Sequence, residues 1–215
     1  MRHIEEAEQE QDEDRGVGLN KVMAFQLAVL LEFTGINVVV IYAAEMLQGI
    51  NSEELELLTP TVLNVFKTGG AMLAIYFLKH VGRKFVLQFG LLVTVVGHSL
   101  TGIGYILQKD PLTNSALSDA MIVGGSLVYM TMYGFALGTI IWLYIPEVVS
   151  PRVLPATTTA VWGVGCLIVV LFPVVNDHLL EANPALIFFF FALLCLLSFA
   201  FNQKFMVESM NKTEK

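Results

Sequence analysis

Two ionisable side chains, Glu32 and Lys67, lie near the middle of long apolar stretches of the sequence. An unpaired charge at the centre of a membrane-spanning helix costs at least about 2.5–3.5 kcal/mol, so such residues are usually paired and functional. His98 lies near the centre of another apolar stretch. A histidine there either relays protons or stays neutral and bonded to a neighbouring helix. This set of side chains suits the binding of a charged solute or the movement of a proton.

The sequence does not predict an enzyme. It contains no Gly-rich phosphate loop, catalytic triad or paired catalytic carboxylates. Its two cysteines, Cys166 and Cys195, both lie inside apolar runs. A disulfide framework or a metal site would need more thiols at fixed spacing. We therefore expect no catalytic residues, no metal and no cofactor.

The composition indicates a surface that faces lipid. Hydrophobic residues make up 55% of the chain and charged residues 14%, and the mean hydropathy is +0.68. A soluble domain has about a quarter of its residues charged. The net charge of −7 argues against nucleic acid as a partner. Seven of the acids lie between Glu5 and Asp14, a block with no base that is typical of a solvated tail or linker.

Six apolar stretches are long enough to cross a hydrocarbon core of ~30 Å as helices. They are Val22 to Leu47, Leu58 to Leu78, Phe85 to Leu107, Ala120 to Ile145, Pro155 to Val175 and Ala185 to Phe201. Helices satisfy their own backbone hydrogen bonds in lipid, which an open sheet cannot do. We predict an all-α membrane protein: a six-helix transmembrane domain at residues 21–203, an acidic solvent-exposed segment at 1–20 and a polar tail at 204–215.

The distribution of basic residues predicts the orientation in the membrane. With six spans, ten of the twelve Lys and Arg residues fall on one face, Lys109 falls on the other and Lys67 lies within a span. Loops rich in Lys and Arg face the cytoplasm, whatever the number of acids. Both termini are therefore expected on the cytoplasmic side, or on the matrix side of a mitochondrial membrane.

Four short motifs resemble the sugar porters of the major facilitator superfamily. They are Thr34-Gly35-Ile36-Asn37 followed by Tyr42, Gly82-Arg83-Lys84, Trp142-x-x-x-x-Glu147 followed by Arg152 and Trp162, and a fainter Val207-Glu208-Ser209. Each motif is weak alone. Their order and spacing agree with the family from Lys21 to Glu208, which makes the combination fairly specific.

The resemblance implies the major-facilitator fold, in which substrate binds at mid-membrane between two six-helix halves. The matched motifs belong to the second half, so the expected fold is a six-helix half-bundle. The acidic N-terminal segment then falls where the family has its linker between halves. Expected partners are the lipid bilayer, a small solute, and a second six-helix half, a second copy or unrelated membrane subunits.

Most positions that bind sugar in the family carry other residues here. Paired glutamines become Leu31 and Glu32, one asparagine becomes Lys67, an acid in the tenth helix becomes Gly134, and an asparagine in the eleventh becomes Gly165. Asn37, Trp142 and Trp162 match the family pattern. The substrate-cavity candidates are therefore Glu32, Asn37, Lys67, Trp142 and Trp162, although tryptophan is also common at membrane interfaces.

The family's geometry places Glu32 and Lys67 on one central cavity. We hypothesise that they form an ion pair there, which a carboxylate-to-ammonium distance beyond about 5 Å with no water bridge would exclude. Such a pair would serve either a site for a charged or zwitterionic solute, or proton coupling. Alternatively, it would lock two helices of a chain that no longer transports.

The resemblance also implies a charge network at the helix ends. Its candidate members are Arg83, Lys84, Glu147 and Arg152, which correspond to residues that steady one gate of the transport cycle. Lys79 stands where the family has an acid. This reversal of charge should weaken the network as a gate and leave pairing between helix ends, which is worth little at an exposed site.

Two functions from different classes remain open. The chain transports a small solute by alternating access together with another half or a second copy. Alternatively, it is a transporter-derived subunit without transport activity that serves as a membrane scaffold in a larger complex, for example a mitochondrial one. Fold alone does not decide between them.

Overall fold

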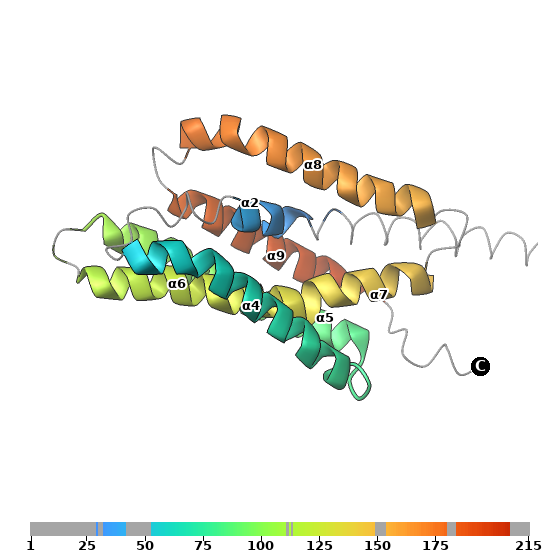
Figure 1. Ribbon diagram of the computed structural model, residues 1–215. Helices are drawn as coiled ribbons and strands as arrows, with labels where there is room; N and C mark the ends of the chain where they lie inside the picture. The colour runs from blue at the N-terminus through green and yellow to red at the C-terminus, as the bar shows by residue number, and fades with distance from the viewer. Residues whose placement is uncertain are drawn as a thin grey trace, which may run out of the picture.

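The structure is a computed structural model that describes residues 29, 32–41, 53–110, 112, 114–148, 154–179 and 184–206. Within these ranges the chain forms helices joined by turns, with no strand (Figure 1). In chain order they are α2 (Ile36–Ile41), α4 (Glu53–Phe77), α5 (Arg83–Gln108), α6 (Ser115–Met132), the π-helix η1 (Tyr133–Leu137), α7 (Gly138–Val148), α8 (Leu154–Leu179) and α9 (Ala185–Phe205).

Four helical segments within the described ranges are long and apolar enough to cross a membrane. They are Arg83–Gln108, Ser115–Glu147, Leu154–Leu171 and Ala185–Phe205. These segments confirm four of the predicted stretches. α4 covers the stretch predicted from Leu58 to Leu78 as a helix, whereas most of the stretch predicted from Val22 to Leu47 lies outside the described residues. The count of six spans and the orientation of the termini stay predictions.

One predicted span is a continuous helical rod with a wide turn in its middle. α6, η1 and α7 follow one another without a break, and the segment Ser115–Glu147 is 33 residues long. The side chain of Asn114 begins this rod by accepting a hydrogen bond of 3.0 Å from the Ala116 backbone N–H. A π-turn inside an α-helix is rare and often occurs at functional sites. The sequence did not predict it.

α5 lies at the centre of the bundle and packs against α6 and α9 (Figure 1). The largest buried apolar cluster combines residues of α5, η1 and α7 with single residues from α8 and α9. α8 runs beside α2 along one side of the bundle, and little of its membrane-spanning part is buried. The helices that carry the candidate site therefore lie around a well-packed α5–α6–α9 core.

Glycines let α5 and α6 approach closely. A Cβ atom at Gly125 would lie 2.6 Å from the Gly97 carbonyl oxygen, and one at Gly97 would lie 2.9 Å from the Gly125 carbonyl oxygen. In lipid, helices associate through such close van der Waals contact, because apolar burial between them gains nothing over contact with lipid tails. Small residues therefore allow α5 and α6 to pack closely at this crossing.

Replacing Gly125 with Ala should destabilise the bundle by about 1–3 kcal/mol, because the added methyl group must push two helix backbones apart. Gly124 is the matched control, since a Cβ atom there has no neighbour within 4 Å. Gly124→Ala should be neutral or stabilising by up to about 1 kcal/mol through helix propensity. Thermal unfolding of both variants in detergent, followed by circular dichroism, checks this. Equal melting temperatures for the two variants would contradict it.

Candidate functional site

A break in the first described helical segment places the first two candidate residues. Gly35 has φ of +87°, a conformation that L side chains rarely adopt. The helical turn that contains Glu32 ends at this glycine, and α2 begins at Ile36. The Phe191 ring of α9 also fills the space where a Gly35 side chain would lie, with ring carbons 2.6 Å from a Cβ atom there. Glycine is therefore required at this position both by conformation and by space.

The break brings Glu32 and Asn37 together across the turn. The Asn37 side-chain amide donates a hydrogen bond to Oε2 of Glu32. Glu32 is 5% exposed. Gly165 of α8 lies against this pair, because a Cβ atom at Gly165 would be 2.6 Å from Glu32 Oε2 and 2.8 Å from Asn37 Nδ2. The Glu32 carboxylate is thus enclosed between the helix break and α8.

His98 of α5 bonds to the backbone of the break. Its Nε2 lies 3.1 Å from the Thr34 carbonyl oxygen, and the side chain is buried. A carbonyl can only accept, so this contact requires the proton on Nε2. The His98 ring also packs on Tyr129, with ring centroids 4.3 Å apart. Of the two roles considered for His98, this geometry supports the one in which it bonds to a neighbouring helix.

The π-turn positions the second part of the site. A Cβ atom at Gly134 would collide with the carbonyl oxygen of Lys67, so glycine lets α4 contact the rod at this point. The Thr139 hydroxyl donates a hydrogen bond of 2.6 Å to the Gly134 carbonyl, which the wide turn leaves without its usual helical partner. The Lys67 backbone is therefore held against η1, and its side chain begins from that contact.

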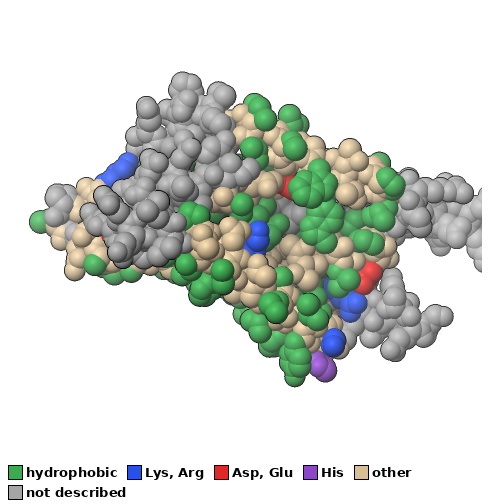
Figure 2. Space-filling view, in the orientation of Figure 1, with side chains coloured by type: hydrophobic (Ala, Val, Ile, Leu, Met, Phe, Trp, Pro, Cys, Tyr) green, Lys and Arg blue, Asp and Glu red, His purple; other side chains and the backbone are tan. Residues whose placement is uncertain are grey.

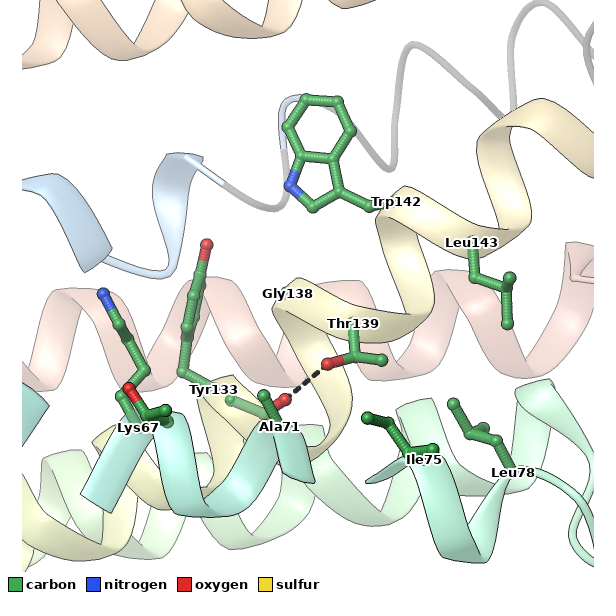
Figure 3. A pocket seen from close by; sticks show the side chains of 11 residues that line it. Lys67, Ala71, Ile75, Leu78, Tyr133, Gly138, Thr139, Trp142 and Leu143 are labelled. Carbon is green, nitrogen blue, oxygen red and sulfur yellow. Dashed lines mark hydrogen bonds between the residues drawn. The ribbon is translucent and has the colours of Figure 1, made fainter. Parts of the chain in front are cut away.

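A cavity of about 680 Å³ lies between α4 and the rod. Its lining residues are Lys67, Thr68, Ala71, Ile75, Leu78, Tyr133, Gly134, Gly138, Thr139, Trp142 and Leu143. The side chains of Lys67, Tyr133 and Trp142 extend to the same side of their helices (Figure 3). Ile75, Leu78 and Leu143 form an apolar end. The volume is in the range of small-molecule sites.

No ion pair between Glu32 and Lys67 is recorded in this structure, so the hypothesis of such a pair finds no support here. Among the described residues, an ion pair is recorded between Arg83 and Glu147 and none between Glu32 and Lys67. The physical reason is that the helix break turns Glu32 toward Asn37 and α8, whereas Lys67 starts on α4 and lines the cavity at the π-turn. Lys67 therefore lines the cavity and Glu32 does not, although Glu32 is near enough to act electrostatically on Tyr133, which does.

The two tryptophans lie next to each other across two helices. The rings of Trp142 on α7 and Trp162 on α8 are tilted, with centroids 6.2 Å apart. Trp142 is 38% exposed and lines the cavity, while Trp162 is 61% exposed and does not line it. The structure thus gives Trp142 a place on the cavity and puts Trp162 beside it.

The candidate charge network joins three helix ends. Arg83 at the start of α5 forms an ion pair of 3.1 Å with Glu147 near the end of α7, and the two side chains are 16% and 20% exposed. The Lys84 ammonium donates a hydrogen bond of 3.0 Å to the Gln203 carbonyl on α9. Basic and acidic side chains gather at this end of the face drawn in Figure 2. Arg152, the fourth predicted member, lies outside the described residues.

Of the lining residues, only Lys67 and Trp142 were among the predicted cavity candidates. Tyr133 and Thr139 were missed because they belong to the π-turn region, which has no direct signature in the sequence. Glycines such as Gly134 and Gly138 are typical of close helix packing, but they do not indicate which side chains face a cavity. Within the described ranges, no group of three or more His, Cys, Asp or Glu side chains is placed to hold a metal ion.

The profile of the family described as "Sugar (and other) transporter" matches residues 7–215, nearly the whole chain. The chain belongs to the sugar transporter family. Family members are transporters of the major facilitator superfamily and are not enzymes. The chain is accordingly an integral, multi-pass membrane protein. This membership confirms the resemblance found in the motifs.

Curated relatives include hexose transporter 1 of Plasmodium yoelii yoelii, which is 23% identical over 203 residues, 88% of this chain and 38% of the relative. The probable metabolite transport protein CsbC of Bacillus subtilis is 29% identical over 196 residues, 87% of this chain and 40% of the relative. The chain therefore spans about two fifths of the length of these relatives.

Solved transporters have the same fold. The chain resembles the inward-open xylose transporter XylE from E. coli with a TM-score of 0.72 and 21% identity, over 98% of this chain and 44% of XylE. It also resembles the proton:xylose symporter XylE bound to 6-bromo-6-deoxy-D-glucose, with a TM-score of 0.73 and 20% identity over 90% and 42% of the two chains. The all-helical, major-facilitator-like fold is thereby confirmed.

Replacing His98 with Phe should destabilise the protein by about 1–3 kcal/mol, because the Thr34 carbonyl at the helix break loses its donor in a buried setting. His98→Gln, which keeps an N–H donor near the same position, should recover part of this loss. Circular dichroism melts of the two variants in detergent measure the difference. A Phe variant as stable as the wild type, or a Gln variant no better than the Phe variant, would show that this contact does not support the break.

Proposed function

We propose that this chain moves a small solute across a membrane by alternating access, together with a second six-helix half or a second copy. The observation that carries the proposal is the cavity at the π-turn, lined by Lys67, Tyr133 and Trp142. Membership of the sugar transporter family supports the same function. Which solute binds would depend on the side chains that line this cavity.

The interrupted helices support a binding role. Transporters commonly bind solutes where helices are broken near mid-membrane, because unwound segments free polar groups and can change conformation. Here the break at Gly35 and the π-turn at Tyr133–Leu137 lie in different segments of one bundle. At the first, Glu32 and Asn37 bond to each other and do not line the cavity, whereas the second places Tyr133 beside Lys67 on its wall. Solute contacts would come from the second interruption.

The helix-end charges suit a role in gating. The Arg83–Glu147 pair joins α5 to α7, and Lys84 joins α5 to α9 at the same end of the bundle. Partly exposed pairs of this kind are usually worth about 0.2–1 kcal/mol each. They are therefore weak enough to open and re-form during a transport cycle. We infer that they steady the end predicted to face the cytoplasm or matrix.

A second candidate is a structural subunit without transport. It is favoured by the contact between Gly134 and the Lys67 carbonyl and by the contact of Gly165 with Glu32 and Asn37. Both glycines stand where the resemblance to sugar porters implies a sugar-binding side chain. Here both positions make close packing contacts and offer no side chain to a sugar. Such packing fits a scaffold in a larger membrane complex.

Transport is tested by purifying the chain from its native membrane with any bound subunits and reconstituting it into liposomes. Counterflow of radiolabelled D-glucose, L-lactate and L-alanine samples a neutral, an anionic and a zwitterionic solute. At least one should exchange faster than in empty liposomes. Trp142→Ala should lower that exchange at least about tenfold, because it removes one wall of the cavity from the bound solute.

Gly124→Ala is the control for this assay, because a Cβ atom at Gly124 meets nothing within 4 Å and Gly124 does not line the cavity. Its exchange rate should equal that of the wild type. Absence of exchange with all three solutes, together with unrelated subunits bound in native mass spectrometry, would instead support the scaffold.

A further inference from the structure

The polar chemistry of the cavity is dominated by one positive charge. Of the lining residues that the structure describes, Lys67 alone has a charged side chain. Within the described ranges, no carboxylate lies within ion-pair distance of its ammonium group. A cation that faces an apolar cavity at membrane depth is strongly favoured by an anionic partner. The charge of the described lining therefore favours an anionic ligand.

The nearby acid does not supply that partner. Glu32 accepts the Asn37 amide and lies against Gly165 of α8, so its carboxylate is enclosed. It does not line the cavity. An amino group of a zwitterionic solute would consequently find no acid among the described residues of the cavity wall. The arrangement favours a solute with a negative charge and no positive one.

The remaining polar groups suit a sugar poorly. The Thr68 hydroxyl donates to the Asn64 carbonyl, and the Thr139 hydroxyl donates to the Gly134 carbonyl. Both hydroxyl protons are therefore already used within their own helices. A sugar needs many hydrogen-bond partners to replace the water it loses, and unpaired hydroxyl groups are costly to bury. Tyr133 is left as a neutral side chain that can donate beside Lys67 (Figure 3).

The rest of the wall is apolar. Ala71, Ile75, Leu78 and Leu143 line it together with the Trp142 ring. Burying a hydrocarbon chain or ring against this apolar surface is favourable, because it removes apolar area from water. In Figure 3 the Lys67 ammonium lies at one end of the view and Leu143 and Leu78 toward the other. A charged head at Lys67 and an apolar body along the wall would fit this layout.

We propose that this cavity binds an organic monocarboxylate, with its carboxylate on the ammonium group of Lys67 and the Tyr133 hydroxyl and its apolar body against Trp142 and the aliphatic wall. The proposal uses the cavity assigned above for transport and names its ligand class, but it requires binding only. Ionised donor and acceptor groups make hydrogen bonds about twice as strong as neutral ones. The Lys67 contact should consequently make the cavity bind a carboxylate more tightly than an amide of the same shape.

The chain offers a direct readout of binding. It contains two tryptophans, Trp142 and Trp162, and their rings are 6.2 Å apart beside the cavity. Hexanoate and its neutral analogue hexanamide are titrated into the full chain in phosphatidylcholine nanodiscs, and tryptophan fluorescence is recorded. Hexanoate should change the emission saturably and bind at least about tenfold more tightly than hexanamide. The Trp162→Phe variant should keep the response, which assigns it to Trp142.

Substitution of Lys67 tests the proposed contact. Lys67→Met should weaken hexanoate binding at least about tenfold and leave hexanamide nearly unchanged, because only the carboxylate loses its charged partner. Lys67→Arg should keep the preference for hexanoate. The contact with Gly134 uses the Lys67 backbone carbonyl and is retained in both variants. Lys109→Met removes the same charge outside the cavity and should bind hexanoate like the wild type.

Three outcomes would overturn the proposal: equal affinities for hexanoate and hexanamide, hexanoate affinity unchanged in Lys67→Met, or no saturable response to either compound. Failure of the transport proposal gives a different pattern. Liposomes that show no exchange while hexanoate binding depends on Lys67 would contradict transport and leave the carboxylate site standing. Exchange of glucose without hexanoate binding would support transport and contradict the carboxylate site.

Discussion

A buried peptide group that leaves the regular helical pattern has no water to bond with, so another protein group must satisfy it. The described chain departs from the α-helical pattern within its segments at Gly35 and at Tyr133–Leu137. At the first, the Thr34 carbonyl is met by His98 of α5. At the second, the Gly134 carbonyl is met by the Thr139 hydroxyl. These two hydrogen bonds make the irregular backbone tolerable, and the candidate site depends on that irregular backbone.

The two departures also place the two charged side chains differently. At Gly35 the chain folds Glu32 back onto Asn37 and against α8, where the carboxylate is covered. At the π-turn, Gly134 draws the Lys67 backbone onto the rod and leaves its side chain on the cavity. The enclosed Glu32 carboxylate takes part in local hydrogen bonding, whereas the Lys67 ammonium makes the cavity wall positively charged. The same two backbone irregularities thus set both the shape and the electrostatics of the site.

Long apolar runs were enough to predict the helices from Arg83 onward, because in lipid composition and length alone select the spans. Family motifs placed Arg83 and Glu147 in one charge network at the helix ends, and in the structure these two side chains form an ion pair. The Glu32–Lys67 pair finds no support because facing one cavity in a family does not fix where a side chain turns at a helix break. The π-turn was missed because it depends on contact between α4 and the rod, which helical periodicity does not encode. Tyr133 and Thr139 were missed with it.

Gly134 and Lys67 touch each other, so their chemistry has to be considered jointly. The resemblance to sugar porters implies an acid at the first position and an asparagine at the second. The Cβ atom of an acid at position 134 would collide with the Lys67 carbonyl, so such a side chain would push α4 away from the rod. Glycine removes this collision: α4 packs closely on η1, and the Lys67 side chain still lines the cavity. Close backbone contact therefore takes the place of the acid that the resemblance implies at this point of the fold.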